Sequence, residues 1–227
     1  MVTYKTKKGK TKMAVSTADI MKLKNTTGAG IKDCKEALEA AKGDFDKAVA
    51  SLREKGKATA AKKADRIAAE GAVGVYSHFG KIGVMVEVNC ETDFAAKAEP
   101  FTELVKNIAM QIAASNPLYL DETAVPAAVL EAEKTILRNK AKAEKKPDAI
   151  IEKIVQGGVA KYYSENCLMF QPFVKEAGKT IADVVTETSA TIGEKITVRR
   201  FARFEVGEGL EKKCENFADE VAKAAKH

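Results

Sequence analysis

The sequence contains no tryptophan and only two histidines, one of which, His227, is the last residue. His78 is therefore the single internal candidate base for a Ser/His/Asp or Cys/His scheme, and no GxSxG motif accompanies it. The cysteines are too far apart to form a CxxC pair that could hold zinc or an iron–sulfur cluster. They are Cys34, Cys90, Cys167 and Cys214. These absences disfavour an enzyme, so we assign no catalytic residue and expect no cofactor.

Long hydrophobic runs are also missing. No stretch of 18 apolar residues occurs, and no apolar segment of the signal-peptide type follows the first methionine. The sequence therefore predicts no membrane partner. We expect an intracellular protein, either cytoplasmic or, after processing, in the stroma or matrix of an organelle.

The positive charge is unevenly distributed. The 227 residues carry a formal net charge of +6, but five lysines lie within the first twelve residues, which contain no acid. Without them the net charge is +1, whereas phosphate binding needs cations concentrated on a folded face. We therefore expect no direct nucleic-acid binding by the body of the protein, and a disordered lysine-rich tail over residues 1–15.

The remaining chain is apolar enough to fold, and its first part predicts a three-helix domain over residues 16–56. Thr17 is the candidate N-cap of the first helix, and Gly28-Ala29-Gly30 separates it from the second. Gly56 is expected to end the third. An Ala/Lys-rich stretch over residues 57–71 reads as a basic linker.

The period of the apolar residues then changes from helical to alternating, which predicts an α+β core over residues 72–206 with an antiparallel sheet. Two helices separated by a short Lys-Lys-Pro connection predict a projecting helical hairpin over about residues 126–164. A helix is expected from Thr180 to Ile192. The last strand is expected to point Ile196, Val198, Ala202, Phe204 and Val206 inward, and residues 207–227 to form a C-terminal helical module.

Three motifs have competing interpretations. The glycines at 28 and 30 resemble a phosphate loop, but the GxxxxGK[ST] pattern is absent, and a turn between helices is favoured. By strand parity, Arg199, Phe201 and Arg203 share one face, which is either a solvated outer face of the sheet or an RNA-binding surface. His78 lies in a hairpin turn, where a lone imidazole usually has a structural role.

The most informative segment is Glu87-Val88-Asn89-Cys90-Glu91-Thr92-Asp93-Phe94, which leaves a strand, contains three acids and an aromatic residue, and ends before the helix that Pro100 opens. Its acids and threonine can be read as Mg²⁺ ligands or an acid/base pair. From spacing alone, Phe94 is a core residue or a hydrophobic staple for the next helix. The other interpretation is an aromatic anchor on a loop, presented to a partner protein.

A set of short motifs, spread in order over about residues 17–222, is similar to bacterial and organellar translation elongation factor Ts. The motifs are Thr27-Gly28-Ala29-Gly30, Asp33-Cys34-Lys35, Ala61-Lys62-Lys63-Ala64, Val86-Glu87-Val88-Asn89-Cys90-Glu91-Thr92-Asp93-Phe94, Gln171-Pro172-Phe173-Val174, and Arg199-Arg200-Phe201 running to Phe204-Glu205-Val206-Gly207-Glu208-Gly209. Each is weak alone, whereas the ordered set is specific.

The resemblance implies a guanine-nucleotide exchange factor, not an enzyme, whose partner is the GTPase elongation factor Tu. It implies that the three-helix domain resembles ubiquitin-associated folds and contacts the partner, and that the Phe94 ring wedges near the partner's Mg²⁺ and phosphate site. The implied partner-binding residues are Lys24, Ile31, Lys32, Asp33, Thr92, Asp93, Phe94 and Ala95. Some short members of the family dimerise, so a homodimer is also open.

The chain departs from the family pattern at two of these positions. Ala95 stands where the family commonly has valine, and Ile31-Lys32 stands where it commonly has two methionines. Alternatives of other classes are a ubiquitin-associated-like adaptor that uses residues 16–56, a ribosome- or RNA-associated helical adaptor, and a metal-dependent hydrolase that uses Glu91, Asp93 and His78.

Overall fold

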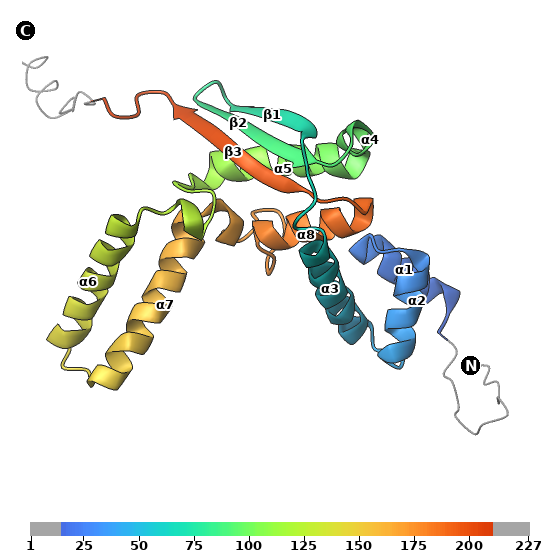
Figure 1. The fold of residues 1–227 in the computed structure, drawn as a ribbon, viewed down its shortest axis with the longest axis horizontal. Helices are drawn as coiled ribbons and strands as arrows, with labels where there is room; N and C mark the ends of the chain where they lie inside the picture. Colours follow the sequence, from blue (N-terminus) through green and yellow to red (C-terminus); the bar gives the residue numbers. More distant parts are fainter. Residues whose placement is uncertain (1–14, 211–227) are drawn as a thin grey trace, which may run out of the picture.

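The computed structural model describes residues 15–210, which form an α+β fold and confirm the predicted class. A three-helix bundle and a helical hairpin flank a three-stranded sheet with helices beneath it (Figure 1). The helices are α1 Thr17–Thr27, α2 Ile31–Ala40, α3 Phe45–Lys62, α4 Asp93–Lys97, α5 Glu99–Ser115, α6 Ala127–Ala143, α7 Asp148–Asn166 and α8 Ile181–Ile192. The strands are β1 Glu70–His78, β2 Ile82–Cys90 and β3 Thr197–Glu205, and two short 3₁₀ turns are η1 Glu122–Ala124 and η2 Leu168–Phe170.

The bundle of α1 to α3 has its own small core. The buried residues are Ile20, Leu23, Cys34, Ala37, Leu38, Ala48 and Leu52. The N-cap of α1 is Ser16 and not the predicted Thr17, because the Ser16 side chain accepts a hydrogen bond from the Asp19 amide at 3.1 Å. Gly28 ends α1 in the left-handed conformation at φ 67°.

Helix α3 continues through Gly56 to Lys62, so the chain does not leave the helix where the glycine predicted. A Cβ built on Gly56 would lie 3.7 Å from the Cβ of Ala190 in α8, which places the two helices in close contact at the glycine. This packing offsets the cost of about 1 kcal/mol that glycine adds to a helix interior. The first part of the predicted linker, up to Lys62, is therefore helical.

The sheet is antiparallel in the order β1-β2-β3, and its inner face carries the main core. Val84, Val86 and Val88 on β2 are buried as their alternation predicted. Helix α5 covers this face (Figure 1). It approaches closely at Gly74 of β1, where a Cβ would lie only 2.4 Å from a methyl carbon of Val105.

A β-bulge in β3 reverses the faces that strand parity predicted. Glu87 pairs with Arg200 and Val88 with Val198, which leaves Arg199 as the extra residue. Ile196 and Val198 before the bulge are buried, as expected. After the bulge the predicted faces are wrong. Phe201 and Arg203 point inward: Phe201 packs on the core, and the side chain of Arg203 is 9% exposed. The residues that were expected to point inward, Ala202, Phe204 and Val206, are exposed.

Helices α6 and α7 form the predicted hairpin, which projects from the body on the side opposite the bundle (Figure 1). Its small core consists of Ala141, Ile151 and Val155, with Leu137, Ile154 and Val159 packed against it. Helix α7 runs through Gly157 and Gly158, and a Cβ on Gly158 would lie 2.5 Å from a Leu137 methyl carbon. Two other apolar residues of α6, Val129 and Ile136, are 37% and 60% exposed.

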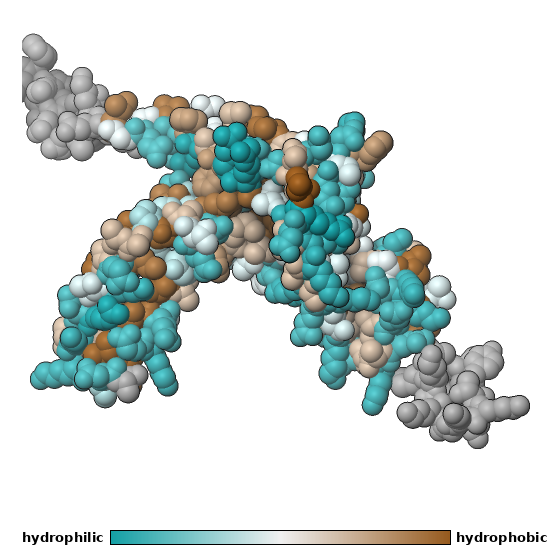
Figure 2. Space-filling view, viewed as in Figure 1, coloured by the Kyte–Doolittle hydropathy of each residue, from teal (hydrophilic) through white to brown (hydrophobic). Residues whose placement is uncertain are grey.

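Figure 2 shows the bundle and the hairpin descending from the body as two arms, with hydrophobic side chains interspersed among hydrophilic ones along the hairpin. Within residues 15–210, no helix is both long and apolar enough to cross a membrane. The predictions for residues 1–14 and for the helix after residue 210 concern parts of the chain outside the described residues.

Candidate functional site

Phe94 is the second residue of the short helix α4, and its side chain is 81% exposed. The interpretation of Phe94 as a core residue is therefore wrong. The reason is the N-cap at Thr92, whose side-chain oxygen accepts a hydrogen bond from the Ala95 amide at 3.3 Å and starts the helix there. Ala95 then faces the core at 5% exposure, so the ring of Phe94 points outward.

The strand end before α4 is tied to a distant part of the chain by Glu194, in the turn between α8 and β3. The Glu194 carboxylate accepts hydrogen bonds from the amides of Glu91 and Thr92 at 3.1 and 3.0 Å. It also accepts one from the Thr92 hydroxyl at 2.7 Å. Sequence reasoning missed Glu194, because it is 102 residues from Thr92 and its role has no local sequence signal.

Glu91 reinforces the same junction. Its carboxylate accepts a hydrogen bond from the Lys195 amide at 2.6 Å and pairs with Arg66 at 3.3 Å. The hydrogen bond from Lys195 holds the pKa of the Glu91 carboxyl below its usual range, and the Arg66 guanidinium lowers it further. Burial raises the pKa of the Cys90 thiol, which keeps its proton and contacts the Thr92 carbonyl at 3.1 Å.

Asp93 lies beside Phe94 on the exposed side of α4 and pairs with Lys97, one turn later, at 2.8 Å. This hydrogen bond lowers the pKa of the Asp93 carboxyl and raises the pKa of the Lys97 ammonium. The Lys97 nitrogen also lies 5.9 Å from the centre of the Phe94 ring. The exposed face of α4 thus presents one carboxylate, one ammonium and one aromatic ring together.

A metal site at this segment is not supported. Glu91 is engaged by Lys195 and Arg66, Asp93 by Lys97, and the Thr92 hydroxyl by Glu194. Among residues 15–210, no group of three or more His, Cys, Asp or Glu side chains is placed to hold a metal ion. The acids of this segment therefore hold the backbone and flanking helices in place.

The bundle residues of the predicted site lie around the start of α2. Ile31 is 54% exposed and Lys32 is exposed beside it, whereas Lys24 is half-buried near the end of α1. Asp33 pairs with Lys55 of α3 at 2.6 Å, which braces α2 against α3. In Figure 1 the bundle and α4 lie on the same side of the molecule, although the structure does not merge them into one continuous pocket.

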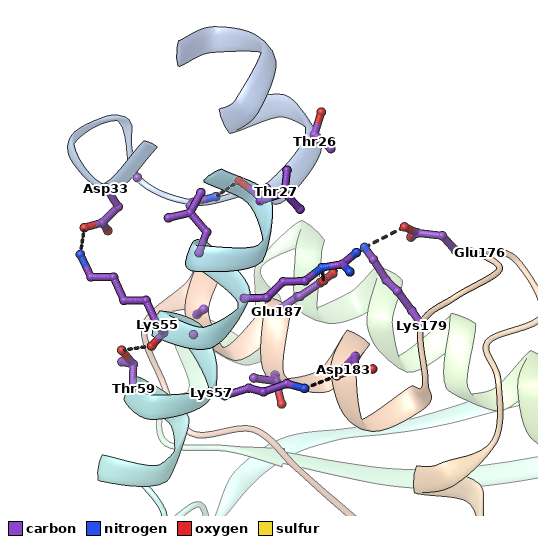
Figure 3. Close-up of a pocket in the computed structure, with 18 residues that line it drawn as sticks. Thr26, Thr27, Asp33, Lys55, Lys57, Thr59, Glu176, Lys179, Asp183 and Glu187 are labelled. Atoms are coloured by element: carbon purple, nitrogen blue, oxygen red, sulfur yellow. Dashed lines mark hydrogen bonds and ion pairs between the residues drawn. The ribbon is translucent and has the colours of Figure 1, made fainter. Parts of the chain in front are cut away.

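The turn at Gly28 is a packing contact, not a phosphate loop. A Cβ on Gly28 would lie 2.6 Å from the Thr191 hydroxyl of α8, so the bundle approaches the core here. The interface continues through Arg53–Glu187 at 3.4 Å and Lys57–Asp183 at 3.0 Å. Figure 3 shows the side chains around a cavity of about 170 Å³ between α8 and the bundle, with Lys57 and Lys179 reaching acidic partners.

The other two candidate motifs have structural partners. The Tyr76 hydroxyl lies 3.0 Å from Nδ1 of His78, at the end of β1 where the hairpin turn begins. Arg199 and Arg200 both pair with Glu87, at 2.8 and 2.6 Å. These contacts hold the arginines on the outer side of the sheet.

Comparison with known proteins shows the family. A sequence model of the family described as elongation factor TS matches residues 9–208. The protein named elongation factor Ts from Geotalea uraniireducens is 55% identical to this chain, over 94% of this chain and 99% of the relative. The one from Alkaliphilus oremlandii is 53% identical, over 93% of this chain and 98% of the relative. Another, from Acetivibrio thermocellus, is 56% identical over 91% of this chain and 97% of the relative. This chain therefore belongs to the elongation factor Ts family and is a translation elongation factor.

Proposed function

We propose that this chain is a guanine-nucleotide exchange factor that binds elongation factor Tu in its GDP form and promotes release of the GDP. The observation that carries the proposal is the 81% exposure of Phe94 on a helix whose start and base are held by Thr92, Glu194 and Ala95. An exposed phenyl ring on a rigid support suits insertion between elements of a partner, because little conformational entropy is lost on binding.

Burial of the Phe94 ring alone does not supply the binding energy that nucleotide exchange requires. Speeding nucleotide release by about 10³ to 10⁴ needs about 4 to 5.5 kcal/mol of preferential binding to the open partner. Burying one phenylalanine contributes about 1.5 to 3 kcal/mol. The bundle surface at Lys24, Ile31, Lys32 and Asp33 is the proposed source of the remaining binding energy, while Asp93 and Phe94 disturb the Mg²⁺ and phosphate site of the partner.

The proposed exchange involves no bond making or breaking by this chain. Linkage then requires that nucleotide and exchange factor weaken each other's binding to the GTPase by the same factor. Lys32 adds a positive charge beside the exposed Ile31, so contact there is proposed to centre on Ile31.

The test is release of fluorescent GDP from elongation factor Tu at increasing concentrations of this chain. We expect Phe94→Ala to slow the maximal release rate by about 10- to 150-fold, which corresponds to the loss of one buried phenyl ring. Phe79→Ala is the matched control, because Phe79 is 88% exposed at the β-hairpin turn, away from α4. Equal rates for the two variants, both folded as the unaltered protein is, contradict the wedge role of Phe94.

We also propose that the chain forms a homodimer through its outer sheet face, defined as Val73, Val75, Met85, Ala202 and Phe204. Val75 pairs with Met85 and Met85 with Ala202, so these side chains form a continuous row across the three strands. The four large ones are 51% to 70% exposed, and no described element covers them. A sheet with one open apolar face is stabilised by a second sheet, and a copy of the same face supplies one by two-fold symmetry.

A further inference from the structure

We infer that the turn Gly193-Glu194-Lys195 is a positioning device for the exchange helix α4, and that Glu194 sets the direction in which Phe94 points. The inference rests on the proposed exchange function and adds positioning residues that act through Thr92 and Glu91. Neither Glu194 nor Lys195 has to contact the partner for this role.

Glu194 is the centre of the contact between the turn and the start of α4. One of its carboxylate oxygens accepts the amides of Glu91 and Thr92 at 3.1 and 3.0 Å, and the other accepts the Thr92 hydroxyl at 2.7 Å. Hydrogen bonds to a charged acceptor are stronger and more directional than those between neutral groups. Three such bonds from two consecutive residues fix both the position and the rotation of the strand end.

Helix α4 depends on this external support because it has only five residues. A helix of one turn is not stable on its own, since nucleation fixes several backbone angles for very few hydrogen bonds. The Thr92 hydroxyl donates to Glu194, and its oxygen also accepts the Ala95 amide at 3.3 Å. Glu194 therefore orients the N-cap itself, and through it the exposed face that carries Phe94.

The same turn also holds the end of the bundle. The Lys63 ammonium, after α3, donates to the Gly193 carbonyl at 2.6 Å. The Lys195 ammonium donates to the carbonyls of Ala64 and Arg66 at 2.6 and 2.9 Å, while its amide donates to Glu91. Three consecutive residues thus link the segment that leaves the bundle to the segment that enters α4. The turn therefore also fixes the position of α4 relative to the end of the bundle.

A double-mutant cycle on fluorescent GDP release tests the inference. We expect Glu194→Ala to lower the maximal release rate at saturating factor by about tenfold. The concentration for half-maximal effect should change by less than about twofold, because binding by the bundle remains. In the Phe94→Ala background the same substitution should lower the rate by less than about twofold, since Glu194 acts through the ring.

Two further variants separate positioning from general stability. Glu194→Gln keeps an oxygen that can accept both amides and should restore at least half of the lost rate. Glu103→Ala removes a carboxylate of similar size from the exposed side of α5 and should leave the rate unchanged. If thermal melting shows that Glu194→Ala is unfolded, substitutions of Thr92 test the same hydrogen bond from its other partner. We expect Thr92→Val to lower the release rate and Thr92→Ser to keep it.

The outcomes distinguish a failure of the positioning role of Glu194 from a failure of the proposed exchange function. An unaltered chain that does not accelerate GDP release overturns the proposed function. If the chain does accelerate release and Phe94→Ala impairs it, but Glu194→Ala has the same effect with and without Phe94, the positioning role is wrong. An unchanged rate in folded Glu194→Ala also overturns it.

Discussion

At the scale of single residues, exposure in this protein is set by neighbours and not by hydrophobicity alone. Phe94 is 81% exposed, whereas the adjacent Ala95 is 5% exposed. The smaller residue is buried because the Thr92 N-cap rotates α4 so that Ala95 faces the core. Apart from its contact with the Lys97 ammonium, the exposed Phe94 ring contributes little to the stability of the isolated chain, which is consistent with a role in binding.

Glu91 gives a prediction about pH. Its pKa in the folded protein lies below the ordinary value of 4.5, so the folded state binds fewer protons than the unfolded state in that range. The stability that Glu91 contributes is therefore present above about pH 4.5 and lost as the pH falls through the lowered pKa. We expect the difference in unfolding free energy between the unaltered chain and Glu91→Gln to shrink from pH 7 to pH 3.5 in urea titrations. A difference that stays constant or grows over this range contradicts the assignment.

At the scale of the elements, contacts between helices override local signals. Gly56 was expected to end α3, yet the helix continues because α8 packs against it. In β3 the bulge at Arg199 exchanges the two faces of the strand for all later residues. Periodicity of 2 predicts which residues share a face only while the pairing register is unbroken.

Alanine substitutions at Gly28 and Gly43 separate the cost of backbone strain from the cost of a packing clash. Both have positive φ, 67° and 85°, so alanine at either is expected to cost about 1 to 2 kcal/mol. A Cβ on Gly28 also meets Thr191 at 2.6 Å, whereas one on Gly43 has no atom within 4 Å. We expect Gly28→Ala to cost at least about 1 kcal/mol more than Gly43→Ala in urea unfolding. Equal losses indicate that the bundle does not rest on α8 at this point.

At the scale of the whole molecule, the sheet and α8 lie between two arms, the bundle and the α6–α7 hairpin (Figure 1). The bundle and α4 present the proposed exchange surface, whereas the far side of the sheet presents the outer sheet face. A chain of this size does not leave a contiguous apolar face uncovered without a cost in solubility. The proposed dimer and the proposed exchange complex use separate surfaces and are compatible.

The dimer is tested by sedimentation equilibrium of the full chain. We expect the unaltered chain to be dimeric at concentrations of about 10 to 100 μM, within the range of ordinary protein association. Met85→Glu should be monomeric, because it places a charge at the centre of the outer sheet face. The matched control is Met21→Glu, since Met21 is 44% exposed on α1, and it should remain dimeric.

A chain that ends at residue 210 identifies the alternative occupant of the outer sheet face. If the full chain is monomeric and the shortened chain is dimeric, the C-terminal residues cover the face and the homodimer proposal is wrong. Monomers in both cases contradict the proposal as well.

Much of this fold could be predicted from the residues in order. Helical and alternating periodicities predicted the bundle, the β-hairpin, the α6–α7 hairpin and α8, because each element places its apolar residues on one side within a few turns or alternations. The ordered motifs were also enough to predict the family. The position of Thr92, Asp93 and Phe94 between a strand and a helix drew attention to this segment, whereas their role in partner binding was implied only by the family resemblance.

Tertiary structure alone decided how that site is built. The exposure of Phe94, the reversal of faces in β3 and the length of α3 each depend on a contact between distant segments. Glu194 lies 102 residues from Thr92, and it supports the exchange helix only because the turn after α8 lies beside the end of β2. Hydrogen bonds between segments so far apart leave no periodic pattern in the chain, so their effect is visible only when the fold brings the partners together.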